Sequence, residues 1–227
     1  MTQMQLDLGI AADGLIEAHE IEKESTFGEF VKWPSTPRWH KGLTITEKID
    51  GTNACVVVDM AKGEVKAQSR KRMITPDDDN AGFARWVYEN AGALMDVLGH
   101  GYHYGEWFGP GIQKNPLGVE QKRFALFHAL KYTPENGYDL EQVDNLETVP
   151  VLFHGQANVL TIADVVEDLQ FYGTKVKGAR LVKEGYAHDP DEYAQAEGII
   201  VFHKETQQKY KILLEDDAFH KWEVQNG

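Results

Sequence analysis

The chain has 227 residues, of which 42% are hydrophobic and 26% charged, so length and composition predict one globular domain. Its 23 basic and 36 acidic residues give a net charge of −13, which argues against a protein that coats nucleic acid through bulk charge but still permits a local basic groove. The single Cys55 excludes an intramolecular disulfide and a multi-cysteine zinc site. No apolar run approaches the ~20 residues that span a bilayer, so we expect a soluble, cytoplasmic protein with no membrane partner.

The first half of the chain has the pattern of strands followed by a helix. Residues 1–27 are acidic, and we interpret them as a leader. Residues 43–50, 53–60 and 64–70 alternate in polarity or are rich in β-branched side chains, and turn residues separate them, so they predict a three-stranded meander. Apolar residues at helical spacing then predict a helix over 82–99.

The second half of the chain is again dominated by strands. Further strands are expected over residues 102–108, 123–130, 198–203 and 209–214, and a helix over 160–172. Strands that are interrupted by helices indicate an α+β class with antiparallel sheets. No linker divides the chain, so we expect a single domain over 1–227 with its core in 28–214.

The sharpest feature is the run TEKIDGTN, in which Lys48 stands at the end of a predicted strand, two residues before Asp50. The ordinary interpretation is a surface lysine beside an Asp-Gly turn, since short motifs recur by accident. The functional interpretation is a lysine nucleophile. A free lysine has a pKa near ~10.4, so holding it neutral near pH ~7.5 costs roughly 4 kcal/mol, which desolvation or neighbouring cations must offset.

Other charged residues stand where they could serve such a nucleophile. Lys209 and Lys211 are two residues apart in a predicted strand and so share a face, which suits the oxygens of a triphosphate. Glu197 begins an apolar strand and is a candidate ligand for a divalent metal. Glu106 is flanked by aromatic residues and could bind a ribose hydroxyl, and Arg70 lies in a cluster of cations that could bind phosphate. For each of these residues the alternative interpretation is a solvent-exposed charge at a strand end or in a turn.

The order of these motifs resembles that of a known superfamily. The motifs occur in the order typical of the covalent nucleotidyltransferases, which include ATP-dependent RNA ligases, DNA ligases and mRNA capping enzymes. In this chain they are KxDG, SRKR, YGEW, FALF, EGIIV and KYK. The resemblance covers about residues 28–214 and is closest to the phage-type RNA ligase 2 family, in TEKIDGTN, FVKWPSTPR and ITPDDDNAGFARW. Asn53 stands where DNA ligases usually carry arginine, whereas Asp50 stands where many members of the family have histidine.

The resemblance implies an ATP-grasp-like, antiparallel-sheet adenylation domain of the DNA/RNA ligase type, and with it an ATP-dependent RNA ligase. Lys48 would attack the α-phosphorus of ATP, become lysyl-AMP and release pyrophosphate. The AMP would pass to a 5′-phosphate end of RNA, and a 3′-hydroxyl would then displace it. Mg²⁺ or Mn²⁺ is the implied metal, with Glu197 as its protein ligand.

The resemblance also implies a role for each residue of the site. Lys48, Asp50 and Lys211 would be catalytic, Lys211 by stabilising charge that develops in the transition state. Further residues would bind the nucleotide together with Lys48 and Lys211. The backbone of Glu47 and the ring of Phe127, by stacking, would contact the adenine, and Glu106 would bind the ribose. Arg70 would bind ribose or phosphate, Asn53 the AMP phosphate or the RNA 5′-phosphate, Lys209 phosphate, and Glu197 would act through the metal. Phe124 is the weaker candidate for stacking because it lies on the other face of the same strand.

One departure from the family concerns the end of the chain. Only sixteen residues (227 − 211) follow Lys211, so we expect neither an OB-fold nor a helical C-terminal domain. We therefore expect a monomer whose affinity for RNA ends or a nicked duplex is modest, or is raised by a protein partner. Three alternatives stay open: a minimal DNA ligase, a non-sealing nucleotide- or RNA-binding module of the same fold, and guanylyl rather than adenylyl transfer.

Overall fold

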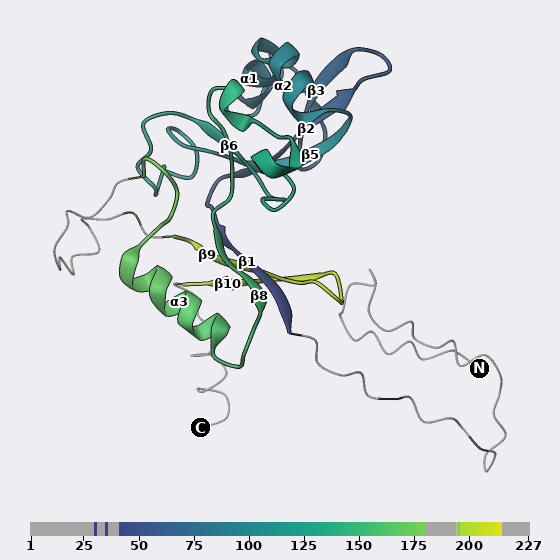
Figure 1. Ribbon diagram of the computed structural model, residues 1–227. Coiled ribbons are helices and arrows are strands. Elements are labelled where there is room, and N and C mark those ends of the chain that lie inside the picture. The colour runs from purple at the N-terminus through teal and green to yellow at the C-terminus, as the bar shows by residue number, and fades with distance from the viewer. Residues whose placement is uncertain (1–29, 31–34, 36–40, 180–193, 195, 215–227) are drawn as a thin grey trace, which may run out of the picture.

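The computed structural model describes residues 30, 35, 41–179, 194 and 196–214, which form two β-sheets flanked by helices (Figure 1). In that view a four-stranded sheet lies below a six-stranded sheet, and β1 leads from the lower sheet toward the upper one. The leader expected over 1–27 lies outside the described residues. Among those that are described, no helix is long and apolar enough to cross a membrane.

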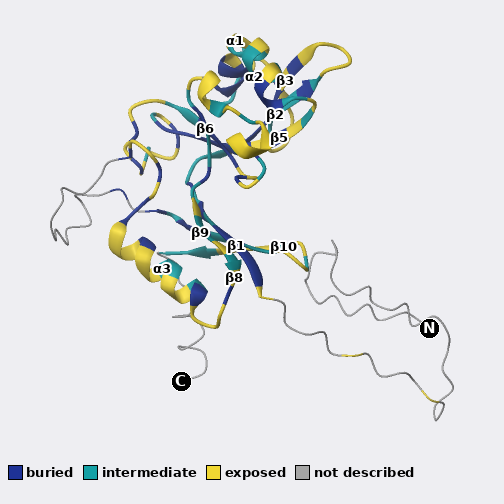
Figure 2. Ribbon diagram, viewed as in Figure 1, coloured by how far each residue is buried: buried dark blue, intermediate teal, exposed yellow. Residues whose placement is uncertain are grey.

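The smaller sheet is built around β1, which is buried along most of its length (Figure 2). Its antiparallel strands follow the order β10 (Gln208–Leu213), β9 (Gly198–His203), β1 (Gly42–Lys48) and β8 (Val151–Gln156). Helix α3 (Thr161–Tyr172) covers one face, where Ile45 and Ile199 join Leu169 of the helix in one apolar cluster. Lys48, three residues after Ile45, therefore faces away from α3.

The larger sheet contains the predicted meander. Its strand order is β4 (Met73–Ile74), β3 (Glu64–Ser69), β2 (Thr52–Asp59), β5 (Gly101–Phe108), β6 (Arg123–Leu126) and β7 (Leu146–Thr148). All neighbouring strands are antiparallel except β6 and β7, which are parallel. Two short 3₁₀ turns, Pro134–Asn136 and Leu140–Gln142, lie between β6 and β7. The predicted α+β class with antiparallel sheets is thus confirmed.

The single helix predicted over 82–99 is wrong, because two helices, α1 (Phe83–Glu89) and α2 (Ala91–Leu98), meet at Asn90. Asn90 has φ −105° and ψ 15°, and its side-chain amide donates to the carbonyl of Trp86 over 2.8 Å. Such a bond competes with the regular helix pattern and favours a helix end. Apolar spacing continues across the break because both helices contribute to one apolar cluster, so periodicity alone could not reveal it.

The larger sheet has one covered and one open face. On β2 the side chains of Ala54 and Val56 are buried in the cluster that α1 and α2 complete. The alternate residues, such as Asn53, point to the opposite face. There the neighbouring strand β5 exposes Tyr102 and Tyr104 to solvent. The sheet is therefore a layer with a core on one side and an open surface on the other.

The two sheets meet where β1 passes into β2 through residues 49–51. A second crossing lies beside the first, because β7 leads into β8 through Val149, and the backbone N–H of Glu47 donates to the carbonyl of Pro150 over 2.9 Å. Ile49 and Val149 belong to the same apolar cluster, which supports both crossings. Strand ends from both sheets consequently come together at this junction.

The contact of β9 with β10 gives a test of the fold. A Cβ at Gly198 would lie 2.0 Å from the carbonyl oxygen of Ile212, so we expect Gly198→Ala to lower the free energy of unfolding by about 1–3 kcal/mol. No atom lies within 4 Å of a Cβ at Gly92 in α2, so Gly92→Ala should instead be neutral or stabilising by about 0.5–1 kcal/mol. Urea denaturation measures both, and equal effects of the two substitutions would contradict this packing.

Candidate active site

Lys48 ends β1, and its ammonium forms an ion pair with Glu197, which stands immediately before β9. Lys48 is opposite Gly198 in the antiparallel register, so both charged side chains leave their strands at the same edge of the sheet. The side chains are 25% and 29% exposed, which leaves the pair accessible to a ligand. The carbonyl of Glu197 also accepts a hydrogen bond from the N–H of Leu214 over 3.1 Å, so the end of β10 is held at the same place.

A second polar pair comes from the larger sheet. Asn53 in β2 lies opposite Glu106 in β5, and Asn53 Nδ2 donates to Glu106 Oε2 over 2.9 Å. Between Lys48 and Asn53 the chain passes through Gly51, where a Cβ would lie 2.6 Å from the carbonyl oxygen of Trp107. The motif requires glycine at this position because the loop lies directly against β5.

Three carboxylates surround Lys48 and influence one another. Glu106 is 8% exposed, and burial raises its pKa to about 7; Lys48 opposes this shift, whereas the charges of Glu197 and Asp50 add to it. Burial likewise raises the pKa of Asp50, with a further contribution from Glu197 and opposition from Lys48. One lysine thus faces more carboxylates than it can neutralise, so the cluster is suited to accept a proton or a further cation.

Glu47 has a different environment from its neighbour Lys48. Its side chain is 1% exposed and accepts hydrogen bonds from the hydroxyl of Thr174 and, over 2.7 Å, from the backbone N–H of Lys175. Burial raises the pKa of Glu47, and these two hydrogen bonds oppose that shift. The side chain of Glu47 therefore anchors the segment that follows α3, and only the backbone of Glu47 remains for the expected contact with adenine. Sequence reasoning missed Thr174 because no motif marks it.

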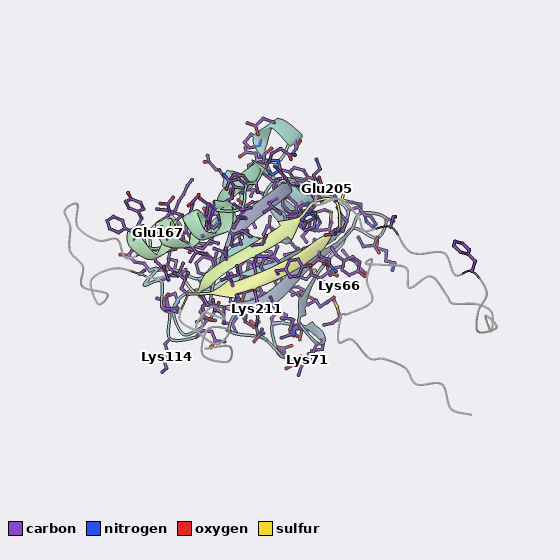
Figure 3. All side chains as sticks on the ribbon, turned by 90° about the horizontal axis from the view of Figure 1, so that it is seen from below. Lys66, Lys71, Lys114, Glu167, Glu205 and Lys211 are labelled. Atoms are coloured by element: carbon purple, nitrogen blue, oxygen red, sulfur yellow. The ribbon has the colours of Figure 1, made fainter. Side chains whose placement is uncertain are left out.

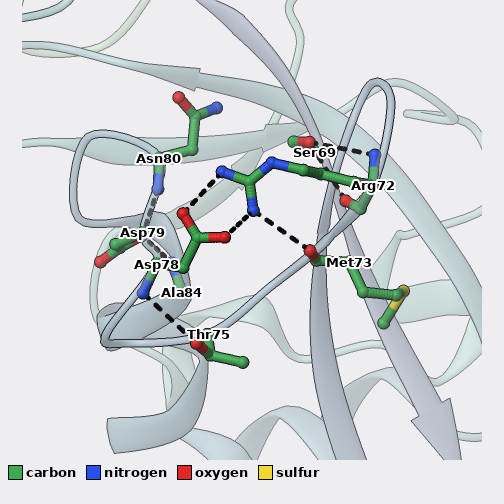
Figure 4. Close-up of polar contacts among 8 residues, drawn as sticks. All are labelled: Ser69, Arg72, Met73, Thr75, Asp78, Asp79, Asn80 and Ala84. Atoms are coloured by element: carbon green, nitrogen blue, oxygen red, sulfur yellow. Dashed lines mark hydrogen bonds and ion pairs between the residues drawn. The ribbon is translucent and has the colours of Figure 1, made fainter.

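Polar contacts join the segments before and after β4 to one another and to the start of α1 (Figure 4). Arg72 forms a two-pronged ion pair with Asp78, in which one nitrogen–oxygen distance is 2.9 Å. Asp79 accepts hydrogen bonds from N–H groups in the first turn of α1 and so satisfies donors that have no partner within the helix. Asn80 Nδ2 then donates to Thr52 Oγ1 over 3.2 Å. Asn80 was not among the expected site residues, although the polar run in which it lies is part of the resemblance.

Lys209 and Lys211 are exposed on the same face of the smaller sheet as Lys48. Lys211 pairs with Ile200, which in turn pairs with Thr46 of β1, so about 12 Å separates the Cα atoms of Lys211 and Lys48. Figure 3 shows Lys211 on the side of the molecule away from α3. Long side chains at this spacing can contact opposite ends of a chain of phosphates.

The two phenylalanines after β5 differ in accessibility. Phe124 is fully buried among the aromatic rings of the core, whereas Phe127 is 40% exposed and its N–H donates to the carbonyl of Tyr104 over 3.0 Å. Burial lowers the pKa of the adjacent His128, and the charge of Lys209 lowers it further, so this segment of the larger sheet lies near β10. Of the two rings, Phe127 is the one that a ligand can reach.

Arg70 lies at the margin of the site. It follows Ser69, which pairs with Ala54, so the chain brings the exposed Arg70 close to the start of β2. Among the expected residues, the structure brings Lys48, Asp50, Asn53, Glu106 and Glu197 together in one polar cluster. It shows no contact of this cluster with the side chains of Arg70, Phe127, Lys209 and Lys211 among the described residues.

The cluster fits a divalent cation that arrives with a ligand. In the described part of the chain no three His, Cys, Asp or Glu side chains are arranged to hold a metal ion by themselves. Glu197 nevertheless offers hard carboxylate oxygens, with Asp50 and Glu106 nearby. Mg²⁺ is usually bound by one or two carboxylates together with substrate phosphates and water. The residues present therefore fit a cation whose remaining ligands come from a nucleotide.

The two sheets and the polar cluster at their junction form an α+β fold, in which every pair of neighbouring strands except β6 and β7 is antiparallel. The chain belongs to the RNA ligase family, which it matches over residues 41–214. No curated protein matches the sequence. The resemblance drawn from the motifs is thus confirmed at the level of the family.

Solved structures of an RNA ligase from Naegleria gruberi share the fold. A mutant without ligand has a TM-score of 0.54 and 13% identity, covering 83% of this chain and 52% of that one. A mutant with ATP and Mn has a TM-score of 0.50 and 15% identity, and the match covers 82% of this chain and 52% of that one. This chain therefore spans about half the length of the structures it matches, and at such identities the likeness establishes the fold alone.

The raised pKa of Glu106 predicts that stability depends on pH. In the folded state the carboxyl of Glu106 has a pKa of about 7, against the ordinary 4.5. Protonation of Glu106 therefore stabilises the folded state fully below pH 4.5, and this stabilisation is lost as pH rises through about 7. The loss amounts to about 3 kcal/mol. We expect Glu106→Gln to remove this fall, whereas Glu89→Gln on the exposed side of α1 should retain it. Denaturation between about pH 5 and pH 8 measures the slope, and an unchanged slope in Glu106→Gln would refute the assignment.

Proposed function

We propose that the protein is an ATP-dependent RNA ligase that works through a covalent lysyl-AMP at Lys48. Membership of the RNA ligase family supports the joining of RNA ends, and the similar structure with ATP and Mn supports ATP as the nucleotide. The observation that carries the proposal is the position of Lys48 at the junction of the sheets, paired with Glu197 and beside Asp50 and Glu106.

In the first step the neutral amine of Lys48 attacks the α-phosphorus of ATP. A nitrogen–phosphorus bond forms, the bond to the oxygen that bridges to the β-phosphate breaks, and pyrophosphate leaves with the electron pair. Lys48 must first lose a proton, and we assign its uptake to Asp50, whose pKa is raised by burial. Lys211 stabilises the charge that develops on the phosphate oxygens, and Lys209 binds the outer phosphates.

Glu197 engages the side chain of Lys48 in an ion pair, and in that pair the nitrogen is not available to attack. A bound Mg²⁺ or Mn²⁺ supplies positive charge that neutralises the triphosphate. Glu197 would hold such a cation, and the nitrogen of Lys48 would then be released from the ion pair. Binding of the cation with its nucleotide and release of the nucleophile would thereby be coupled through one carboxylate.

The nucleoside part of ATP is bound by residues from both sheets. Phe127 stacks on the adenine, and the backbone of Glu47 borders the base. Glu106 binds the ribose, and with a pKa of about 7 it can either donate to or accept from a hydroxyl at neutral pH. Arg70 contacts ribose or phosphate from the end of β3.

Two transfers complete the reaction. An oxygen of the RNA 5′-phosphate attacks the phosphorus of lysyl-AMP, the bond to nitrogen breaks, and Lys48 takes back a proton. A 3′-hydroxyl then attacks the 5′-phosphate, the new phosphodiester forms, and AMP leaves. Asn53, held by Glu106 beside the Asp-Gly loop, binds the AMP phosphate or the 5′-phosphate during these steps.

Removal of the nucleophile tests the first step. Lys48→Ala should abolish a covalent protein–AMP adduct, because no amine then stands at the end of β1. Lys62→Ala, at an exposed lysine in the turn between β2 and β3, is the matched control and should retain the adduct. The protein is incubated with α-labelled ATP and a divalent cation, and the adducted peptide is identified by mass spectrometry. An adduct retained in Lys48→Ala would sink the assignment.

The same preparation distinguishes the alternatives to RNA ligation. A GMP adduct with labelled GTP would indicate capping chemistry rather than adenylyl transfer. Sealing of nicked DNA, without joining of 5′-phosphorylated RNA to 3′-hydroxyl ends, would indicate a DNA ligase. An AMP adduct that never leads to joined ends would indicate a non-sealing module.

Lys211 has a separate kinetic prediction. Lys211→Ala should slow the formation of lysyl-AMP by roughly 10²–10³-fold, as the loss of one donor to a developing oxyanion does elsewhere. Lys204→Ala, at an exposed lysine in the turn between β9 and β10, should leave the rate unchanged. Single-turnover measurements with labelled ATP give the rate. An equal rate in Lys211→Ala and the parent protein would remove Lys211 from the site.

A further inference from the structure

The open face of the larger sheet carries an aromatic surface that the chemistry of ATP does not use. Tyr102 and Tyr104 on β5, here called the tyrosine platform, are 60% and 53% exposed. Their rings lie nearly parallel, with centroids 6.2 Å apart and planes inclined by 15°. The opposite face of this sheet packs against α1 and α2, and the two tyrosines are not part of that apolar cluster.

The platform is continuous with the catalytic cluster. Glu106, Tyr104 and Tyr102 alternate along β5 and so point to one face of the sheet. At about 3.4 Å per residue, Tyr102 lies about 14 Å from Glu106 along the strand. This is about the length of four stacked nucleotides at about 3.4 Å each. A strand whose end lies at the cluster therefore has its next few nucleotides beside the platform.

Cations flank the platform on the same side of the molecule. Lys66 in β3, which forms an ion pair with Glu64, lies across β2 from Tyr102 in the register of the sheet. The exposed Arg70 and Lys71 follow that strand. Figure 3 shows Lys66, Lys71 and Lys211 on the side of the molecule away from α3, with Lys66 on the larger sheet and Lys211 on the smaller one. In a chain with a net charge of −13, a side on which cations gather favours a polyanion and disfavours a second copy of the acidic chain.

We propose that the tyrosine platform binds unpaired bases of the RNA strand next to the end that is joined, so that the protein prefers single-stranded extensions to blunt duplexes. This inference rests on the proposed function and names its substrate class. Aromatic rings stack on bases of any sequence, while the exposed Lys71 and the Lys66 side chain offer positive charge to the backbone phosphates. Bases within a duplex are stacked on one another and cannot stack on the rings, which is why a single strand is required.

Binding of a single-stranded probe tests the platform. The probe is a 5′-phosphorylated, unstructured RNA of about 12 nucleotides with a fluorophore at its 3′ end, and anisotropy is measured without ATP or divalent cations. Tyr102→Ala should weaken binding about 5-fold to 100-fold, because one stacking partner is lost. Tyr102→Phe keeps the ring and should retain the affinity. Tyr88→Ala, at a 42% exposed tyrosine on α1, is the matched control and should also retain it.

The blunt duplex of the same strand gives the second expected result. It should bind more weakly than the single strand, and its binding should not respond to Tyr102→Ala. Equal affinity of Tyr102→Ala and the parent protein for the single strand would overturn the inference. A parent protein that binds no RNA, or an equal loss in Tyr88→Ala, would overturn it as well.

Two further measurements distinguish base stacking from self-association and from the adenylylation chemistry. If Tyr102→Ala changed the sedimentation of the free protein but not its affinity for RNA, the platform would be a contact between copies of the chain, and the inference would fall. The adduct assay is independent of RNA. An AMP adduct on Lys48 together with RNA binding that does not depend on Tyr102 would reject the platform alone. RNA binding that depends on Tyr102 without any adduct would reject the ligase chemistry and keep the platform.

Discussion

The short connection from Lys48 to Asn53 is the constraint on which the arrangement of the site depends. Lys48 is the last residue of the central strand of one sheet, and Asn53 lies in the first strand of the other. Between them the loop approaches β5 so closely at Gly51 that no side chain fits. The ion pair of Lys48 and the hydrogen bond of Asn53 therefore lie on either side of one tight crossing, and a shift of one sheet against the other would disturb both.

The charged cluster at this crossing is suited to chemistry and is a weak source of stability. Burial raises the pKa of Glu106 and Asp50 beside one another, which disfavours their charged forms in the folded state. Perturbed carboxylates of this kind are typical of functional sites, since an ion pair with uncompensated neighbours is a weak source of stability. The stability comes instead from the apolar clusters behind the crossing and from anchors such as Glu47, whose buried carboxylate is fully engaged by the segment after α3.

The sequence predicted what local pattern or motif order encodes. Strands such as β2 and β9 were expected to within one residue, because β-branched or apolar runs end at turn residues. The break at Asn90 and the short parallel strand β7 were not expected, since neither alters the apolar spacing. Within the site, 149 residues separate Lys48 from Glu197, and only the order of motifs linked them. The bonds from Thr174 to Glu47 and from Asn80 to Thr52 join segments that no spacing relates.

The positions of the helices explain how an acidic chain can serve an anionic substrate. Helix α3 covers one face of the smaller sheet, α1 and α2 cover one face of the larger, and the uncovered faces adjoin the same crossing. Figure 3 shows Glu167 on the α3 side and Lys211 on the opposite side. A net charge of −13 averages over all faces of the molecule. What the protein can bind is decided by the local field at the uncovered faces, where Lys209 and Lys211 lie on the same face of the smaller sheet as Lys48.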